Sequence, residues 1–217
     1  MNHIKNVIVL GKGSLAIKIT NWFKENPDYN IICVVPVIPE PTWTDSFKDW
    51  AIHNNIPIVK SGDYNEIKNV QEQNWEIDLC FSIFYDKIIK DWFIQKCKKI
   101  LNLHNASLPK YRGVQPINWA LKNNEEKHGI TIHEITPGID DGPIISQLDY
   151  SIYPYFDEVN DVYKRALSYS WNLFEQTMPI IEKIIPKEQD ESCATYYSTK
   201  QSEQLEERQN FTKESSK

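Results

Sequence analysis

The sequence Asn6-Val-Ile-Val-Leu-Gly-Lys-Gly-Ser14 opens the chain with an apolar run and a glycine turn. A continuous apolar run of this kind is typical of a parallel strand that is buried on both faces. Residues 15–23 follow with the spacing of a helix. Strand, glycine turn and helix in this order are the first unit of a doubly wound α/β fold. We therefore expect a Rossmann-like, doubly wound fold with a mostly parallel sheet.

The glycine turn has two interpretations. Gly11-x-Gly13-x-x-Ala16 matches a dinucleotide fingerprint, but the second strand, residues 29–35, runs into Pro36-Val-Ile-Pro39 where an acidic residue is required. The missing acid counts against a nicotinamide or flavin enzyme. The N–H groups of the turn can receive a phosphate, or the glycines serve only a tight turn. The sequence leaves both interpretations open.

The rest of the chain alternates strand-like and helix-like segments. We expect further strands at residues 56–59, 78–82, 100–103, 129–135 and 143–150, and helices at 45–54, 65–71, 87–98, 114–123 and 157–185. Residues 186–217 are polar and charged, with a short strand or hairpin expected at 194–198. This pattern predicts a main domain over residues 1–185 and a small C-terminal extension over 186–217.

Composition excludes several classes of protein. The chain has 217 residues and a net charge of −6, with no basic stripe suited to a nucleic acid. Its four cysteines lie far apart with no Cys-x-x-Cys pair, so we expect no metal site, and Cys33 and Cys80 are expected to be buried and reduced. No signal-peptide pattern or membrane-spanning apolar run is present, which favours a soluble, cytoplasmic protein with no membrane partner.

Residues 100–113, Ile-Leu-Asn-Leu-His-Asn-Ala-Ser-Leu-Pro-Lys-Tyr-Arg-Gly, contain the candidate chemistry. On a strand, Asn102 and His104 point to the same face. A carboxamide and an imidazole together can stabilise an oxyanion and move protons. Asp140 lies on a glycine-bracketed loop further along the chain. Since Asn at a strand end also commonly caps a turn, an Asn102–His104–Asp140 trio is a hypothesis.

A set of motifs in fixed order resembles the folate-dependent formyltransferase family. They are Asn102-Leu-His104, Ser107-Leu-Pro109, Tyr111-Arg-Gly113, Gly129-Ile-Thr-Ile-His133 and Ile139-Asp-Asp-Gly-Pro143. The resemblance covers roughly residues 75–150 and extends more weakly back to residue 6. It implies the formyltransferase fold and transfer of a formyl group from N10-formyltetrahydrofolate to a primary amine.

The resemblance also implies roles for the trio. Asn102 would donate a hydrogen bond to the oxyanion, His104 would add positive charge there, and Asp140 would keep the imidazolium charged and oriented. Asp141 is the alternative acidic partner, although the motif alignment favours Asp140. We interpret His133 as a packing histidine.

Ligand-binding residues follow from the same resemblance. The pterin would enter between residues 84–88 and the loop 137–141, with contacts from Phe84, Tyr85, Ile88, Ile139 and Asp141. For the substrate we name Lys12, Ser14, Lys87 and Asn105. Tyr111 and Arg112 either hold the loop or contact ligand.

Three classes of formyltransferase differ in the amine that accepts the formyl group. A methionyl-tRNA formyltransferase would have a C-terminal RNA-binding domain and a basic surface. A glycinamide ribonucleotide formyltransferase would have Asn where Leu15 stands and His-Pro-Ser where His104-Asn-Ala-Ser107 stands. Motifs around Gln115–Trp119 and in the tail resemble the class that acts on nucleotide-linked amino sugars.

We therefore expect a homodimeric sugar-nucleotide N-formyltransferase. Its expected substrate is dTDP-4-amino-4,6-dideoxyglucose or a similar 4-amino sugar used in surface polysaccharide or O-antigen synthesis. The alternatives are the purine enzyme, a formyltetrahydrofolate hydrolase using the same trio, and a binding protein without catalysis.

Overall fold

The structure, a computed structural model, describes residues 3–67 and 76–205. The chain divides into two compact units. The first comprises Met1–Leu103 and Glu134–Pro137, and the second comprises His104–His133 and Gly138–Lys217. Each unit is continuous in space but discontinuous in sequence. The predicted boundary at residue 185 stays a prediction.

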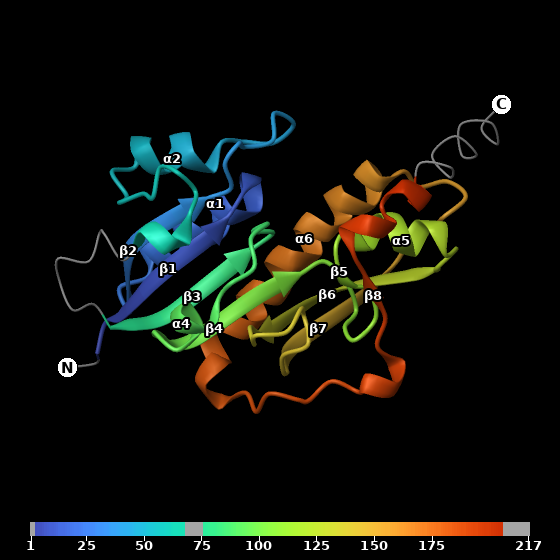
Figure 1. The fold of residues 1–217 in the computed structure, drawn as a ribbon. Helices are drawn as coiled ribbons and strands as arrows, with labels where there is room; N and C mark the ends of the chain where they lie inside the picture. The colour runs from blue at the N-terminus through green and yellow to red at the C-terminus, as the bar shows by residue number, and fades with distance from the viewer. Residues whose placement is uncertain (1–2, 68–75, 206–217) are drawn as a thin grey trace. The chain divides into compact units, whose positions relative to one another are not determined.

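Four parallel strands form the sheet of the first unit (Figure 1). They are hydrogen-bonded in the order β2 (Tyr29–Pro36), β1 (Lys5–Gly11), β3 (Ile77–Ile83) and β4 (Cys97–His104). Helices α1 (Gly13–Glu25), α2 (Phe47–His53) and α4 (Asp91–Ile94) and the 3₁₀ turn η1 (Tyr64–Glu66) connect them. The mostly parallel α/β fold is confirmed.

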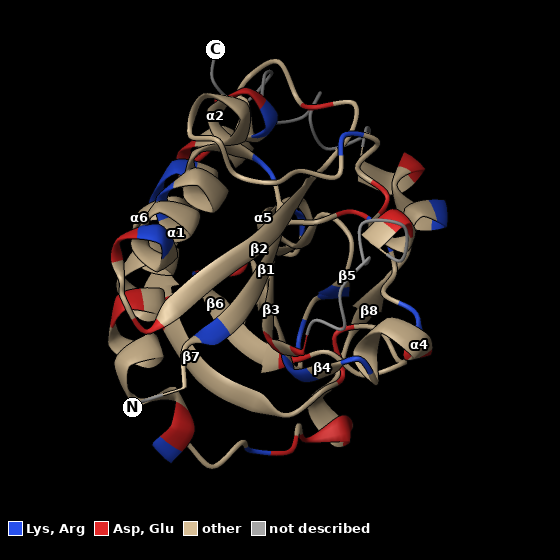
Figure 2. Ribbon diagram, turned by 90° about the vertical axis from the view of Figure 1, so that its left-hand side faces the viewer, with Lys and Arg blue, Asp and Glu red and all other residues tan. Residues whose placement is uncertain are grey.

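Both faces of this sheet are buried. Ile8 and Leu10 of β1 belong to an apolar cluster with Tyr64 and Phe93. The ring of Phe81 in β3 meets that of Phe23 in α1, at 6.4 Å between ring centroids. No charged residue interrupts β2, which is tan throughout in Figure 2. Burial on two sides explains why these strands are continuous apolar runs without alternation.

The glycine turn allows close packing of two strands. A Cβ at Gly11 would lie 2.5 Å from the carbonyl oxygen of Ile83, so only glycine fits between β1 and β3 at this point. The N–H of Ser14 in the first turn of α1 donates to Thr44 Oγ1 at 3.4 Å. These contacts favour the tight-turn interpretation of the motif.

Two predicted elements of this unit differ from the structure. The helix predicted at 87–98 is wrong, since only Asp91–Ile94 is helical and β4 begins at Cys97. Its apolar residues suggested a helix, but Ile88 is 69% exposed while Phe93 fills the core. The predicted strand at 56–59 is a single bridge between Val34 and Ile58. The predicted helix at 65–71 lies partly outside the described residues.

The second unit contains an antiparallel pair and two longer helices. Strands β6 (Lys127–Glu134) and β7 (Ile144–Ser151) pair directly, and the short strands β5 (Arg112–Gly113) and β8 (Tyr196–Tyr197) form a parallel pair. The helices are α5 (Pro116–Lys122) and α6 (Val159–Thr177), and the 3₁₀ turns are η2 (Met178–Lys183), η3 (Glu191–Cys193) and η4 (Thr199–Gln201).

Helix α6 ends earlier than the predicted 157–185. It changes to 3₁₀ geometry at Met178 because Pro179 has no N–H to continue the α-helical ladder. The expected short strand at 194–198 is present as β8, which pairs with β5 and so ties the C-terminal segment into this unit.

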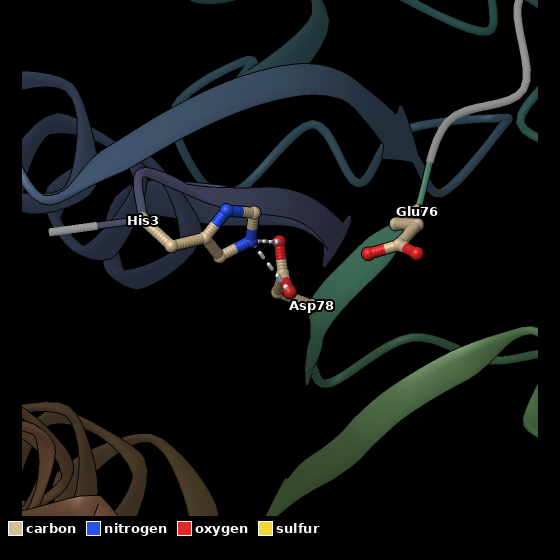
Figure 3. A group of neighbouring side chains, drawn as sticks. All are labelled: His3, Glu76 and Asp78. Carbon is tan, nitrogen blue, oxygen red and sulfur yellow. Dashed lines mark hydrogen bonds and ion pairs between the residues drawn. The ribbon is translucent and has the colours of Figure 1, made fainter. Parts of the chain in front are cut away.

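A polar group ties together the N-terminal ends of strands in the first unit. His3 and Asp78 hydrogen-bond, and Glu76 lies beside them (Figure 3). Lys98 Nζ lies 2.8 Å from Asp78 and 2.7 Å from Glu76. Although the histidine and the two carboxylates have metal-ligand spacing, Lys98 already supplies the compensating charge. We interpret this group as a structural ion-pair cluster.

Asp78→Asn should destabilise the protein by about 1–3 kcal/mol at neutral pH, because its buried carboxylate accepts from Lys98, His3 and the Asn6 N–H. Burial raises the pKa of Asp78, but these partners outweigh it and hold the pKa below its ordinary value. Its stabilisation is therefore complete above about pH 3.9 and is lost as the pH falls through the folded-state pKa.

Thermal unfolding at pH 7 and pH 3 checks this. The difference between wild type and Asp78→Asn should shrink at pH 3. Glu76→Gln is the matched control, because the Glu76 side chain is 70% exposed and should contribute little. Equal losses from both substitutions would contradict the interpretation.

Candidate active site

His104 at the end of β4 is buried, at 7% exposure. Its Nε2 lies 2.8 Å from the carbonyl oxygen of Tyr111, and its Nδ1 lies 3.6 Å from Asp140 Oδ2. Both ring nitrogens therefore face acceptors. An imidazole can donate at both positions only when it is protonated, so the surroundings of His104 suit a positively charged ring.

Asp140 is shared by two histidines. His133 Nε2 lies 3.5 Å from Asp140 Oδ1, whereas His104 faces the other carboxylate oxygen, Oδ2. The N–H of Gly113 also donates to Oδ2, at 2.8 Å. Burial acts to raise the pKa of Asp140, but His104, His133 and the Gly113 N–H outweigh it and hold the pKa well below its ordinary value. Asp140 is therefore a buried, ionised carboxylate.

The contact with Asp140 changes the interpretation of His133. The prediction of a packing histidine accounts for its 2% exposure but not for its place beside a buried carboxylate. Its ring also lies 6.3 Å from that of His104, edge to face. The sequence placed His133 on a predicted strand, but nothing in the local sequence identified its partner.

Unusual backbone conformations occur at the predicted site. Asp140 has φ of 51°, Tyr111 of 61° and Phe84 of 54°, all in the left-handed region that residues other than glycine seldom adopt. Strain of this kind persists only where surrounding contacts hold it, and it is frequent at functional sites.

Tyr111 and Arg112 hold the loop. The Tyr111 hydroxyl donates to Glu125 at 2.7 Å. Arg112 is 8% exposed and donates to both Gln189 Oε1 and the Glu191 carboxylate. Gln189 is a residue that sequence reasoning missed, since no motif distinguishes it in a polar segment.

The predicted site residues fall into two groups, one in each unit. His104, Asn105, Ile139, Asp140 and Asp141 lie in the second unit, whereas Lys12, Ser14, Phe84, Tyr85, Lys87, Ile88 and Asn102 lie in the first. Asn102 is in β4, two residues before His104. Its part in the trio stays a prediction.

Several predicted ligand contacts have partners in the first unit. The Tyr85 hydroxyl and Lys87 Nζ both donate to the carbonyl oxygen of Gly62, at 2.7 and 2.9 Å. Ile88 is 69% exposed, and its carbonyl oxygen accepts from Tyr64. These side chains therefore have structural roles whatever they bind.

In the second unit, the predicted substrate residue Asn105 has a buried side-chain oxygen that can accept a hydrogen bond. It is 8% exposed, and its Oδ1 has no hydrogen-bond partner among the described residues. A buried acceptor without a partner is costly, so Asn105 suits a ligand that donates a hydrogen bond. Ile139 is 39% exposed on the loop before Asp140.

Comparison with known proteins agrees with this geometry. The profile of the formyl transferase family matches residues 5–178. The chain belongs to the formyl transferase family. The resemblance seen in the motifs is thereby confirmed, and the match includes both His104 and Asp140.

Among curated relatives, the chain is 34% identical over 147 residues to the bifunctional polymyxin resistance protein ArnA of Wigglesworthia glossinidia brevipalpis. That alignment covers 66% of the chain and 22% of the relative, so the chain corresponds to a minor part of a much longer protein.

Two solved structures are also similar. WlaRD, a sugar 3N-formyl transferase described in the presence of dTDP and 5-N-formyl-THF, has a TM-score of 0.77 at 28% identity, covering 91% of this chain and 71% of WlaRD. The N-formyltransferase of Helicobacter canadensis, in complex with folinic acid and dTDP-3-aminofucose, has a TM-score of 0.76 at 26% identity, covering 90% of this chain and 71% of that protein.

Within residues 3–67 and 76–205, no helix has the length and apolar character to cross a membrane.

Gly113→Ala should disturb the site through the backbone. Gly113 has φ of 91°, and a Cβ there would lie 2.1 Å from the carbonyl oxygen of Tyr197. The β5–β8 pair must then open, and the N–H that donates to Asp140 must move. We expect a loss of about 1–3 kcal/mol in unfolding free energy, measured by urea denaturation.

The neighbouring substitution Val114→Ala is the control, since Val114 is 37% exposed. A Gly113→Ala protein as stable as wild type would show that the close approach of Gly113 and Tyr197 is not a constraint.

Proposed function

We propose that the protein transfers the formyl group of N10-formyltetrahydrofolate to the amine of a nucleotide-linked amino sugar. The observation that carries the proposal is the buried pair of His104 with the ionised Asp140. Family membership supports the reaction class, and the two solved structures described above support the substrate class, because their descriptions name sugars, dTDP and folates.

In the proposed reaction, the chain supplies charge and hydrogen bonds. Asn102 donates to the oxygen that becomes negative when the amine attacks the formyl carbon. His104 adds positive charge beside that oxygen, held by its contacts with Asp140 and the Tyr111 carbonyl. Direct donation by His104 Nε2 requires it to leave that carbonyl. Asp140 orients the ring and passes, through water, the proton that the amine loses to the folate nitrogen, which leaves as its bond to the formyl carbon breaks.

We propose the predicted ligand residues as contacts. The residues predicted to contact the pterin are Phe84, Tyr85, Ile88, Ile139 and Asp141. Asn105 would accept from the attacking amine through its unpartnered Oδ1. Lys12, Ser14 and Lys87 would bind the diphosphate, and Lys87 has two further N–H donors besides the one that it gives to Gly62.

The finer assignment is a dTDP-linked amino-dideoxyhexose. The predicted amine is at carbon 4, whereas the descriptions of both solved relatives name position 3, so both positions must be tested. We further propose a cytoplasmic homodimer that supplies surface polysaccharide or O-antigen, with a catalytic domain over residues 1–185 and an extension over 186–217. The alternatives are the purine enzyme and the hydrolase.

A turnover panel decides between these functions. The protein is incubated with N10-formyltetrahydrofolate and, in separate reactions, dTDP-3-amino and dTDP-4-amino sugars, UDP-linked amino sugars and glycinamide ribonucleotide, and tetrahydrofolate release is followed. Release only with a sugar nucleotide supports the proposal. Release with glycinamide ribonucleotide selects the purine enzyme, and release without any amine selects the hydrolase.

Replacement of the trio should abolish turnover without unfolding the protein. Asn102→Ala should lower kcat about 10²–10³-fold, and His104→Asn or Asp140→Ala should lower it at least as much. His53→Asn and Asp28→Ala, both exposed and remote in sequence, are the matched controls. Turnover like wild type in any trio variant with a native circular dichroism spectrum would overturn that residue's role.

A further inference from the structure

Residues 187–197, here called the C-terminal strap, connect the loop that follows His104 to the segment that carries Asp140. At one end, Lys187 exchanges backbone hydrogen bonds of 2.8 and 2.7 Å with Ile144, just after the Asp140 loop. At the other end, Thr195 Oγ1 accepts from the N–H of Tyr111, whose carbonyl pairs with His104. The strap therefore contacts both segments that bring the pair together.

Gln189 uses its whole side-chain amide in this connection. Its Nε2 donates to the carbonyl oxygens of Asp140 and Gly142, at 2.8 and 2.7 Å. Its Oε1 accepts from Arg112 Nε and Nη2, at 3.1 and 2.8 Å. One side chain thus joins the backbone on either side of Asp141 to the guanidinium of a buried arginine.

These bonds hold Asp140 in its left-handed conformation. Its φ of 51° is unfavourable for an aspartate, so the flanking carbonyls must be fixed by partners. The residue after Arg112 is Gly113, whose N–H donates to Asp140 Oδ2. The Gln189–Arg112 contact therefore fixes two groups relative to each other. One is the Gly113 N–H, which donates to the Asp140 carboxylate, and the other is the backbone of Asp140 itself.

We infer that Gln189 is a positioning residue that sets the direction of the Asp140 carboxylate toward His104 and His133. The inference rests on the proposed function, because it takes Asp140 as the partner of a working His104. Gln189 acts through Asp140, since its side-chain hydrogen bonds go to the carbonyl oxygens of Asp140 and Gly142 and to Arg112.

Two substitutions separate its donors from its acceptor. Gln189→Glu keeps the length of the side chain and an oxygen for Arg112, but a carboxylate has no N–H for the carbonyls of Asp140 and Gly142. Gln189→Met keeps similar volume and loses both functions. Glu188→Gln, at an exposed neighbouring position, is the matched control.

Two readouts are used on the full chain. With the amino sugar nucleotide that wild type turns over, we expect Gln189→Glu to lower kcat about 10–100-fold, as displacements near 1 Å do, with KM values within about twofold. Independently of turnover, the carboxyl ¹³C resonance of Asp140 is followed against pH. It is assigned by its absence in Asp140→Asn.

In wild type that resonance should stay in the ionised position down to about pH 4, since the pKa of Asp140 lies below its ordinary value. In Gln189→Glu it should begin to titrate toward the ordinary pKa of about 3.9. A resonance and a kcat that both match wild type would overturn the inference. A fall in kcat that only parallels a lower folded fraction, with an unchanged resonance, would overturn it as well.

Failure of the proposed function gives a different result. If wild type transfers no formyl group to any amine, the proposed function fails, while the Asp140 resonance still reports whether Gln189 sets the state of the carboxylate. Partial rescue is tested with the single substitution Gln189→Asn. Because this variant keeps an amide on a shorter side chain, we expect its kcat to lie below that of wild type and above that of Gln189→Glu.

Discussion

A charged carboxylate buried inside the second unit is the constraint on which its architecture depends. An ionised group removed from water is tolerated only when partners replace its hydration. Asp140 has three such partners in His104, His133 and the N–H of Gly113. They come from β4, β6 and β5, so a single charge requires three separate segments to converge on one loop.

The same arrangement places a hydrogen-bond acceptor at each nitrogen of one histidine. His104 has acceptors at both nitrogens, one a carboxylate and the other a backbone carbonyl. Each acceptor is itself held by the strap, Tyr111 through Thr195 and Asp140 through Gln189. A polar segment that looked like an appendage in the sequence is therefore part of the support of the site.

The first unit also contains a buried carboxylate that is held by partners from several segments. Its sheet is apolar on both faces, which leaves charges only at the strand ends. Asp78 is the buried exception, and Lys98, His3 and the Asn6 N–H surround it. In both units a buried aspartate marks the place where segments distant in sequence are joined.

Local pattern was enough for the long buried strands, because a run such as Val7–Leu10 has few ways to bury its side chains other than a doubly covered sheet. It was not enough for residues 87–98, where apolar residues in an irregular segment have the same spacing as a helix. The Asn102-x-His104 spacing and the ordered motifs also identified the family before any coordinates.

The sequence by itself determined the α/β class, the family and the identity of His104 and Asp140 as candidates, because these depend on residues that are neighbours in the chain. Only the tertiary structure decided that His133 shares the carboxylate and that Gln189 holds its loop. The bonds of Gln189 to Asp140 and Arg112 span 49 and 77 residues. A contact of that range leaves no local periodicity, since it is set by how the chain folds back on itself.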